Sequence, residues 1–413
     1  GGLFHDLHYQ AAGHQTFAEP RNGLPRSERT DWELGLGATP GDHSLGVVAE
    51  FNRREEGPAG ALGLVPDAVS AGWTGARADF ALGDPEVPGF AGAVSWVRGD
   101  LDAGRLGSWT TDQLWLHTRG EAAAMDRPLA VEATAGWIDY HEPRADRQRT
   151  YVDLKTTLHS DRGWFAGLRA SAYDRQALIM PVLGMEHQTE DIRLWAISDP
   201  TLTIPAFRSV FVVNGDWNVP DWGLGGVRRP LHLELGAAWE LGESAAFQVS
   251  TEGARISQLR TWTRDAQVFR EVAAAKATEV RTRAAASWRP GPLDLGVDAL
   301  WQRVRTDGGR VPYLAAHTLR VSGAYRLGRL TLGGTGNRVS GRITEAGAAY
   351  GDFWRWDADL AYRLGSSGLP LGARWLEVNL RVENLFDAAD VRWPGVPGYG
   401  RGVYAGIRLA ESD

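Results

Sequence analysis

Apolar and polar residues alternate with a period of two along most of this chain. The segment 376–383 is the clearest example, because its even-numbered positions are Leu or Val and its odd-numbered positions are Glu, Asn or Arg. Similar alternation recurs in 231–239, 319–326, 354–363 and 403–409. Successive side chains of a β-strand point to opposite faces, so the pattern predicts strands with one apolar and one polar face.

The length of these runs favours a membrane barrel over a packed sandwich. The runs extend to about ten residues or more, which is what a tilted strand needs to cross a bilayer. Strands of soluble sheets average about five or six residues. We therefore predict an all-β fold, a transmembrane antiparallel β-barrel of about 20–22 strands with short periplasmic turns and longer extracellular loops. Tryptophan residues beside predicted turns fit interfacial girdles: Trp109, Trp164, Trp239, Trp288, Trp301 and Trp375.

The pattern defines nineteen strand cores, at 31–39, 44–55, 71–82, 90–99, 109–121, 129–140, 150–160, 163–174, 191–198, 207–215, 230–240, 245–257, 277–288, 292–305, 316–326, 329–341, 352–363, 374–386 and 401–410. Single-chain bacterial barrels have an even number of strands, so a further strand is expected within 2–20. The count rises to 22 if 191–229 or 258–276 contains another pair. Segment 174–190 is interpreted as one of the longer loops, and the prolines of 191–215 make that segment the weakest prediction.

One domain fits this pattern. We expect an N-terminal segment at 1–30, which is either the end of a plug or the first barrel strand. The barrel follows at 31–410 and a short tail at 411–413. No helical domain, heptad repeat or low-complexity tract interrupts the pattern, and Gly1 is interpreted as the start of a processed or trimmed chain.

Composition narrows the function classes. The chain has 413 residues, 18 of them Trp, and no Cys, which excludes disulfides, thiolate metal sites and cysteine nucleophiles. A formal net charge of −7 gives no basic footprint for nucleic acid, so no nucleic-acid partner is expected. No run of eighteen apolar residues is present, which excludes a transmembrane helix. A mean hydropathy of −0.29 is compatible with a barrel, because only alternate residues of a strand face lipid.

The last forty residues carry a motif. An Asn-Leu-Phe-Asp box ends a strand, a loop rich in Pro and Gly follows, and Gly-Arg opens the closing strand; its residues are Asn384, Leu385, Phe386, Asp387, Gly400 and Arg401. In order, spacing and position this resembles the C-terminal signature of TonB-dependent outer-membrane receptors. Asn384 and Asp387 are suited to bond their own backbone where the ladder ends, and Phe386 suits an interfacial anchor. The motif therefore identifies an architecture and not a ligand.

The resemblance implies a location and partners. It places the chain in the outer membrane of a Gram-negative-type bacterium, in contact with outer-membrane lipid. Family members also carry an N-terminal plug that fills the barrel and a short motif that binds TonB, and neither is present in 1–413. Gly1-Gly2-Leu3-Phe4 resembles the end of such a plug. The chain departs from many outer-membrane barrels in ending Leu409 to Asp413 without a terminal aromatic residue.

No catalytic or cofactor site is expected, because no nucleophile elbow, phosphate loop or zinc-protease motif occurs. The protein is therefore predicted not to be an enzyme. His141, His187 and Glu190 are candidates for a metal or metal-chelate site in outer loops, although solvated loops without a metal are the simpler interpretation. The polar faces of the C-terminal strands predict a set of lumen-facing residues: Arg320, Arg326, Arg355, Arg363, Glu377, Arg381 and Glu383.

Two hypotheses follow for function. The first is the barrel of a TonB-dependent transporter that takes up a scarce ligand such as a siderophore or another metal chelate, with TonB acting through an upstream plug. The second is a plug-less barrel of the same descent that serves as a scaffold or conduit, with other envelope proteins filling its lumen. A general diffusion porin is disfavoured by the C-terminal motif.

Overall fold

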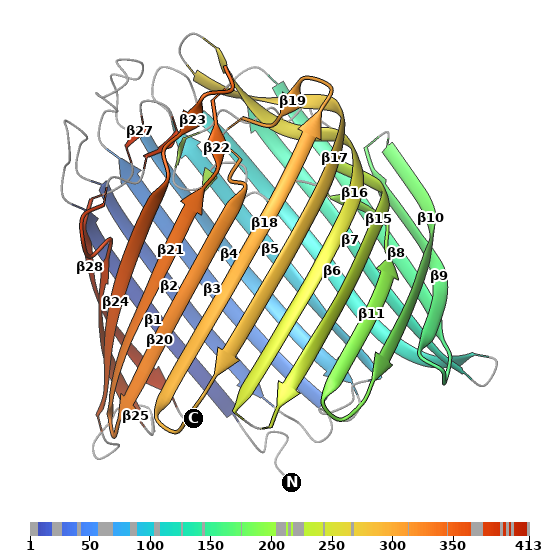
Figure 1. The fold of residues 1–413 in the computed structure, drawn as a ribbon. Coiled ribbons are helices and arrows are strands. Elements are labelled where there is room, and N and C mark those ends of the chain that lie inside the picture. The colour runs from blue at the N-terminus through green and yellow to red at the C-terminus, as the bar shows by residue number, and fades with distance from the viewer. Residues whose placement is uncertain are drawn as a thin grey trace.

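The structure is a computed structural model. It describes residues 7–410 except 19–26, 39–42, 57–68, 83–88, 103–107, 125–126, 143–144, 175, 204–211, 214–215, 218–226, 243, 266–267, 313, 345, 365–374, 389–390, 394–395 and 398–399. The described chain forms one large antiparallel sheet curled into a barrel (Figure 1). No helix in these residues is long and apolar enough to cross a membrane.

The barrel wall follows the order of the sequence. Its strands are β1 Leu7–Ala18, β2 Ser27–Ala38, β3 His43–Glu56, β4 Val69–Leu82, β5 Phe90–Asp102, β6 Ser108–Ala124, β7 Arg127–Glu142, β8 Ala145–His159, β9 Trp164–Tyr173, β10 Gln176–Gln188, β11 Ile192–Ser198, β12 Thr201–Thr203, β15 Val227–Leu241, β16 Ala245–Asp265, β17 Val268–Trp288, β18 Leu293–Thr306, β19 Gly309–Arg310, β20 His317–Leu327, β21 Leu330–Ser340, β24 Phe353–Leu364, β25 Trp375–Glu383 and β28 Gly402–Ala410.

Pairing between the first and last strands closes the sheet. β1 pairs with β2 on one side and with β28 on the other, in a register that runs from Gln10↔Ala410 to Ala18↔Gly402. The sheet has 22 strands, but β12 continues β11 along the same partner β15, and β19 only extends the end of β18. Counting β11 with β12 and leaving β19 aside gives 20 wall strands. The predicted barrel is confirmed, and β1 is the strand expected within 2–20.

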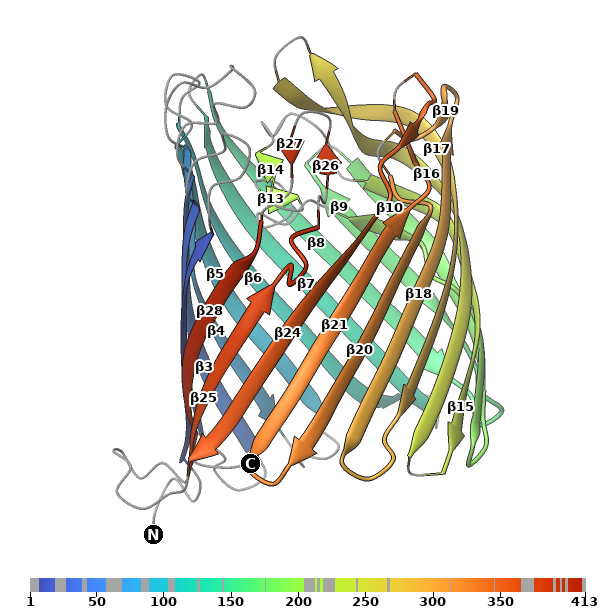
Figure 2. The ribbon, with the colours of Figure 1, turned by 60° about the vertical axis from the view of Figure 1, so that its left-hand side comes forward.

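The two ends of the barrel differ. Short turns join β8 to β9, β15 to β16, β17 to β18 and β20 to β21 at one end, here called the turn end. At the opposite end, called the loop end, the connections between β18 and β20, β21 and β24, and β25 and β28 are longer (Figure 2). Gly163, Gly242, Gly291 and Gly328 of these four turns all have positive φ, between 59° and 80°, which glycine adopts without steric cost. Short hairpins near the loop end stand apart from the wall: β13 Val212–Val213 with β14 Asp216–Trp217, β22 Arg342–Ile343 with β23 Ala349–Tyr350, and β26 Val391–Trp393 with β27 Val396–Pro397.

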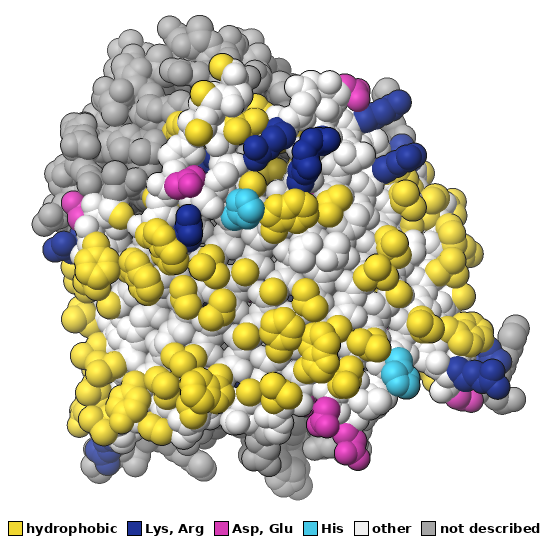
Figure 3. All heavy atoms as spheres, viewed as in Figure 1, with side chains coloured by type: hydrophobic (Ala, Val, Ile, Leu, Met, Phe, Trp, Pro, Cys, Tyr) yellow, Lys and Arg dark blue, Asp and Glu magenta, His cyan; other side chains and the backbone are white. Residues whose placement is uncertain are grey.

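Alternation along the strands separates an apolar outer face from a polar lumen. On β15, Leu231, Leu233 and Leu235 are about half exposed, at 54%, 46% and 51%, whereas His232 and Glu234 between them face the lumen and are hydrogen-bonded. Figure 3 shows apolar side chains forming a band across the face of the outer wall that is in view. An outer face on which the described strands expose apolar side chains at alternate positions belongs in contact with lipid.

Aromatic side chains border this band near the turn end. Trp239 of β15 stacks on Phe247 of β16, with ring centroids 5.4 Å apart, and Trp288 of β17 is 51% exposed on the outer face. Indole and phenyl rings at this level suit the interface between hydrocarbon and headgroups. Of the predicted girdle residues, Trp164, Trp239, Trp288 and Trp301 lie on partly exposed strand positions.

One strand was wrongly predicted as a loop. Residues 174–190 contain β10, which pairs with β9 from Gln176↔Tyr173 to Met185↔Trp164. Pro181 interrupts the alternating pattern, yet it lies in the part of β10 that β11 does not pair with, where a missing N–H is tolerated. The predicted core 207–215 is no wall strand in its described residues: Val212–Val213 form the small hairpin strand β13, and the other positions lie outside the described residues.

The segment between β11 and β12 breaks the ladder. β11 ends with Ser198↔Leu233, and β12 resumes with Thr201↔Arg229, so β15 accommodates one extra residue across the break. Pro200 has no N–H to donate here, and β10 pairs with β11 only as far as Leu183↔Ser198. The wall is therefore least regular at Asp199 and Pro200, in the segment that the sequence marked as weakest.

Glycine allows close approach between β8 and β9. A Cβ added at Gly167 would lie 1.7 Å from the carbonyl oxygen of Thr156, a backbone atom that cannot swing away. We predict that Gly167→Ala lowers the free energy of unfolding by about 1–3 kcal/mol, because the two strands must separate. Urea titration in detergent, followed by tryptophan fluorescence, measures the change.

The matched control for this prediction is Gly253→Ala in β16, where an added Cβ would meet no atom within 4 Å. Both variants reduce the conformational freedom of the unfolded chain equally. The difference between their free energies of unfolding therefore reports packing in the folded state. Equal stability of the two variants would contradict the packing argument.

Candidate functional site

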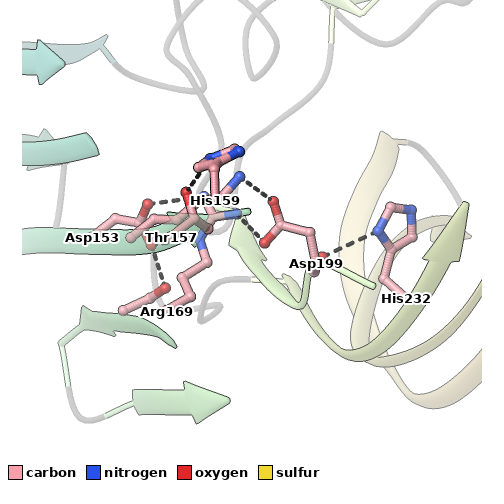
Figure 4. A network of polar contacts seen from close by, with 8 residues as sticks. Asp153, Thr157, His159, Arg169, Asp199 and His232 are labelled. Carbon is pink, nitrogen blue, oxygen red and sulfur yellow. Dashed lines mark hydrogen bonds and ion pairs between the residues drawn. The ribbon is translucent and has the colours of Figure 1, made fainter. Parts of the chain in front are cut away.

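A network of charged side chains crosses the lumen wall beside the broken strand, with Asp199 at its centre (Figure 4). The Arg169 guanidinium of β9 donates two parallel hydrogen bonds to Asp153 of β8, at 2.9 and 2.8 Å, and a third of 3.0 Å to Asp199. Lys155 Nζ donates to the other carboxylate oxygen of Asp199 at 2.9 Å. Bidentate guanidinium–carboxylate pairs are strong and directional, so this arrangement fixes the position of the break.

The network continues onto the strands that follow the break. His232 of β15 makes hydrogen bonds with the backbone oxygen of Asp199 at 3.1 Å and with Glu252 of β16 at 3.0 Å. Arg281 of β17 binds both Glu252, at 3.2 Å, and Glu279, at 2.5 Å. Arg229 also donates to Glu279, which is only 3% exposed. Each carboxylate of the network has a cationic partner, so the network ties neighbouring strands of the wall together.

An aromatic cluster adjoins this network toward the loop end. Tyr151 and Tyr173 lie two residues from Asp153 and Ser171 on the same faces of β8 and β9, and the Tyr151 hydroxyl donates to the backbone oxygen of Leu202 at 3.2 Å. Lumen-facing side chains here are almost fully buried, although a barrel lumen of this size is open to water in cross-section: Ile138, Tyr140, Tyr173 and Val182 are 0–1% exposed. Leu202 of β12 lies against this part of the inner wall, because its backbone oxygen accepts the hydrogen bond from Tyr151.

A second lumen network joins the C-terminal strands. Asp357 of β24 accepts hydrogen bonds from Arg355 at 3.1 Å and Arg381 at 3.4 Å, and Glu383 of β25 binds the same two arginines at 2.5 and 3.5 Å. The structure therefore brings together three of the predicted lumen residues, Arg355, Arg381 and Glu383.

The other predicted lumen residues lie elsewhere on the wall. Arg363 and Glu377 form a separate pair at 3.2 Å, nearer the turn end. Arg320 is in register with Asp298 and Asn337, on the face opposite to its apolar neighbours. Arg326 lies at the turn end of β20 and is exposed.

The C-terminal motif has a physical basis in this network. Asn384 is 1% exposed with a φ of 51°, its backbone N–H donates to Asp357 at 2.9 Å, and its side chain both accepts from Ala388 N at 2.8 Å and donates to Ala388 O at 3.0 Å. Asp387 also has a positive φ, of 52°, and Leu385 N donates to Trp356 O at 2.7 Å. The box therefore ends β25 in a tight turn that the lumen network holds. Phe386 is 70% exposed, Gly400 is buried, and Arg401 is exposed just before β28.

The candidate metal residues are not brought together. His141 lies at the loop end of β7, with Nδ1 3.0 Å from Asp146 and Nε2 3.7 Å from Asp139. His187 and Glu190 lie at the opposite turn end, because β10 and β11 are joined by the short turn 189–191 and not by an outer loop. The prediction that they lie in an outer loop is wrong because Pro181 interrupts the alternating pattern, so that the sequence resembles a loop where the strand β10 lies. No group of three or more metal-ligating side chains occurs among the described residues.

Sequence reasoning missed the Asp199 network. Its members occupy inward positions of strands that were predicted, and an explicit cross-strand register would have aligned Asp153 with Ser171 and Glu252 with Arg281. Asp199 itself lies in the proline-interrupted segment, where the pattern gave no register.

No protein-family model and no curated protein sequence matches this chain. Solved structures do share its fold. The FrpB iron transporter from Neisseria meningitidis (F3-3 variant) aligns at a TM-score of 0.64 and 14% identity over 99% of this chain and 82% of that chain. A mutant of the ferric enterobactin receptor PfeA from Pseudomonas aeruginosa aligns at 0.65 and 11% identity over 98% and 80%. The copper transporter OprC aligns at 0.63 and 14% identity over 99% and 81%.

These structures are transporters and receptors and not enzymes. Their likeness confirms the barrel fold, and it agrees with the resemblance to TonB-dependent receptors that the C-terminal motif carries. At 11–14% identity the likeness establishes the fold alone.

The Asp199 network predicts a large effect at Arg169. Arg169→Leu leaves Asp153 and Asp199, which are 9% and 18% exposed, without their main partner. We expect a loss of about 3–5 kcal/mol in the free energy of unfolding, because a mostly buried charge is left uncompensated. Arg289→Leu, which breaks a pair with Asp294 whose side chains are 68% and 40% exposed, should cost less than about 1 kcal/mol. Equal losses in urea titrations would show that the network does not stabilise the break.

The motif turn predicts a graded series at Asn384. Asn384→Gly keeps the left-handed backbone but removes both side-chain hydrogen bonds, and Asn384→Ala adds backbone strain to that loss. We expect both to lower unfolding stability, by about 1–3 kcal/mol for Gly and by about 1 kcal/mol more for Ala. Thermal unfolding in detergent measures both. Identical values for Ala and Gly would contradict the role assigned to the positive φ.

Proposed function

We propose that this chain is the barrel of a TonB-dependent receptor in the outer membrane of a Gram-negative-type bacterium, and that it takes up a scarce ligand such as a metal chelate. The observation that carries the proposal is a closed barrel of 20 strands whose last strands hold the Asn-Leu-Phe-Asp turn through Asp357. Similarity in fold to iron and copper transporters and to a ferric enterobactin receptor supports the same class of function.

The size of the barrel requires something in its lumen. Barrels of 16–18 strands leave an aqueous channel, and barrels of 22 strands hold a plug. At 20 strands an empty lumen would leak small solutes. We infer that a plug, encoded upstream or supplied by another envelope protein, occupies the lumen of the mature protein.

The inner wall offers groups that would bind such a plug. Arg283, Arg363 and Arg381 face the lumen and are 63%, 51% and 52% exposed, although each has a carboxylate nearby. Exposed guanidinium groups can form additional bidentate pairs with carboxylates of a plug. The wall itself performs no chemistry on the ligand; it positions the plug and surrounds the path that opens when TonB displaces it.

Uptake by cells tests this proposal. The complete gene is expressed in a strain that lacks its own ferric enterobactin and copper receptors, and accumulation of radioactive iron from ferric enterobactin and of radioactive copper is measured. We expect accumulation of at least one of these metals, because the barrel provides the path, and we expect its loss in an otherwise identical strain without TonB.

Two results would contradict the proposal. Equal accumulation with and without TonB would indicate a passive pore. No accumulation of either metal, with the protein present in the outer membrane, would favour the alternative of a scaffold or conduit filled by other proteins. Cells with the empty vector provide the baseline.

A further inference from the structure

The outer wall carries a compact group of cations around Thr278 of β17. Thr278 is in register with Arg255 of β16 on one side and with Arg305 of β18 on the other. Neighbouring strands lie about 4.8 Å apart, so the two arginine Cα atoms are about 10 Å from each other across Thr278. Cross-strand partners point to the same face, which places both guanidinium groups and the hydroxyl on one side of the sheet.

Two further cations complete the group. Lys276 lies two residues from Thr278 on β17, and Arg303 lies two residues from Arg305 on β18, so both share the face of Thr278. All four cationic side chains are exposed. Arg255, Lys276, Arg303 and Arg305 together form the cation group.

This face is the outer one. Arg255 is in register with Leu231, and Arg303 with Val280, and these two apolar side chains are 54% and 40% exposed in the band. The intervening residue Glu279 points the other way, into the lumen network, and is 3% exposed. The cation group therefore lies on the surface that faces lipid and not in the channel.

The depth of the group matches a membrane surface. Trp301, 39% exposed on the outer face of β18, lies two residues before Arg303 and marks the edge of the apolar band. Figure 3 shows Lys and Arg side chains gathered just beyond this edge, toward the loop end over β16–β18. An amphipathic indole followed by cations along one strand is the order expected from hydrocarbon through the interface to charged headgroups.

Within the described part of the chain, no carboxylate is ion-paired with the cation group, although the exposed Asp307 follows Arg305 by two residues. Most lumen-facing arginines, by contrast, are paired with carboxylates. A fifth cation, Arg310 of β19, is directly opposite Arg305, although its side chain donates to Gly341 O at 2.7 Å. Like charges in register repel each other, so an anion bound between them would stabilise the arrangement.

We propose that the cation group is a binding site for the phosphate of a lipid headgroup in the outward-facing leaflet. Arginine forks and a lysine bind phosphate oxygens by charge-assisted hydrogen bonds, and the Thr278 hydroxyl supplies a neutral donor between them. The acyl chains of the same lipid would lie along Leu231, Val280 and Trp301. The inference rests on the proposed function for its membrane location and orientation, and it adds a ligand on the outer wall that the transport path does not use.

Lipid binding to the purified full chain in non-ionic detergent tests the site. Native mass spectrometry measures retention of diphosphorylated lipid A, with phosphatidylcholine as the zwitterionic comparison. We expect the wild type to retain lipid A preferentially. The double variant Arg255→Gln/Arg305→Gln should bind it about 30-fold more weakly. Each cation near a charged lipid surface contributes about 5-fold in affinity, and the variant removes two.

The matched control is Arg320→Gln/Arg326→Gln, which removes two exposed arginines from the lumen face of β20 and changes the net charge equally. Its affinity for lipid A should equal that of the wild type. Heat-dependent gel mobility confirms that each variant is a folded barrel before the comparison.

The inference is overturned if the wild type and the Arg255→Gln/Arg305→Gln variant bind lipid A equally, or if the lumen control loses as much affinity as that variant. It is also overturned if inorganic phosphate displaces lipid A at constant ionic strength, because the site would then bind free anions. These outcomes are separable from failure of the proposed function. Lipid selectivity with no TonB-dependent uptake would overturn the transport proposal alone, and uptake without lipid selectivity would overturn this inference alone.

Discussion

Closure of the backbone hydrogen-bond ladder is the constraint on which the rest of this structure depends. A strand in hydrocarbon has no water to satisfy its N–H and C=O groups, so every wall strand needs a neighbour on both sides. The pairing of β1 with β28 removes the last open edge. Where the ladder fails, between β11 and β12, side chains compensate: Lys155 and Arg169 hold Asp199, Tyr151 binds Leu202 O, and Arg228 donates to Ala177 O of β10 at 3.2 Å.

The closed wall gives the protein two surfaces with different electrostatics. In the lumen, water and neighbouring carboxylates allow many charges, and the arginines of both networks are used to tie strands together. On the outer face a charge is tolerated only beyond the apolar band, which is where Arg255 and Arg305 lie. The same residue type is therefore a structural tie inside the barrel and an anion ligand outside it, because burial and the nearest counter-charge differ.

The C-terminal motif shows how a short sequence signature arises from a packing requirement. Asn384 must adopt a left-handed backbone, bond its own chain four residues on, and present its N–H to Asp357. Few residues satisfy all three demands, and Asn tolerates positive φ better than other non-glycine residues. The motif therefore reports the way a barrel of this fold ends its penultimate strand, and it carries no information about a ligand.

The sequence alone determined the fold class and the position of the C-terminal turn, whereas the predicted total of about 20 strands agrees with the structure only because the missed strand β10 and the wrongly predicted strand 207–215 cancel. These features follow from a period-two pattern and from turn residues, both of which are local along the chain. Only the tertiary structure decided that 176–188 is a wall strand, that Asp199 is the centre of a network, and that Arg255, Thr278 and Arg305 are neighbours. The physical reason is that cross-strand register is set by hydrogen bonds to a partner far away in sequence. Pro181 made β10 resemble a loop in the sequence, because only the pairing shows that its missing N–H lies where β10 has no partner in β11.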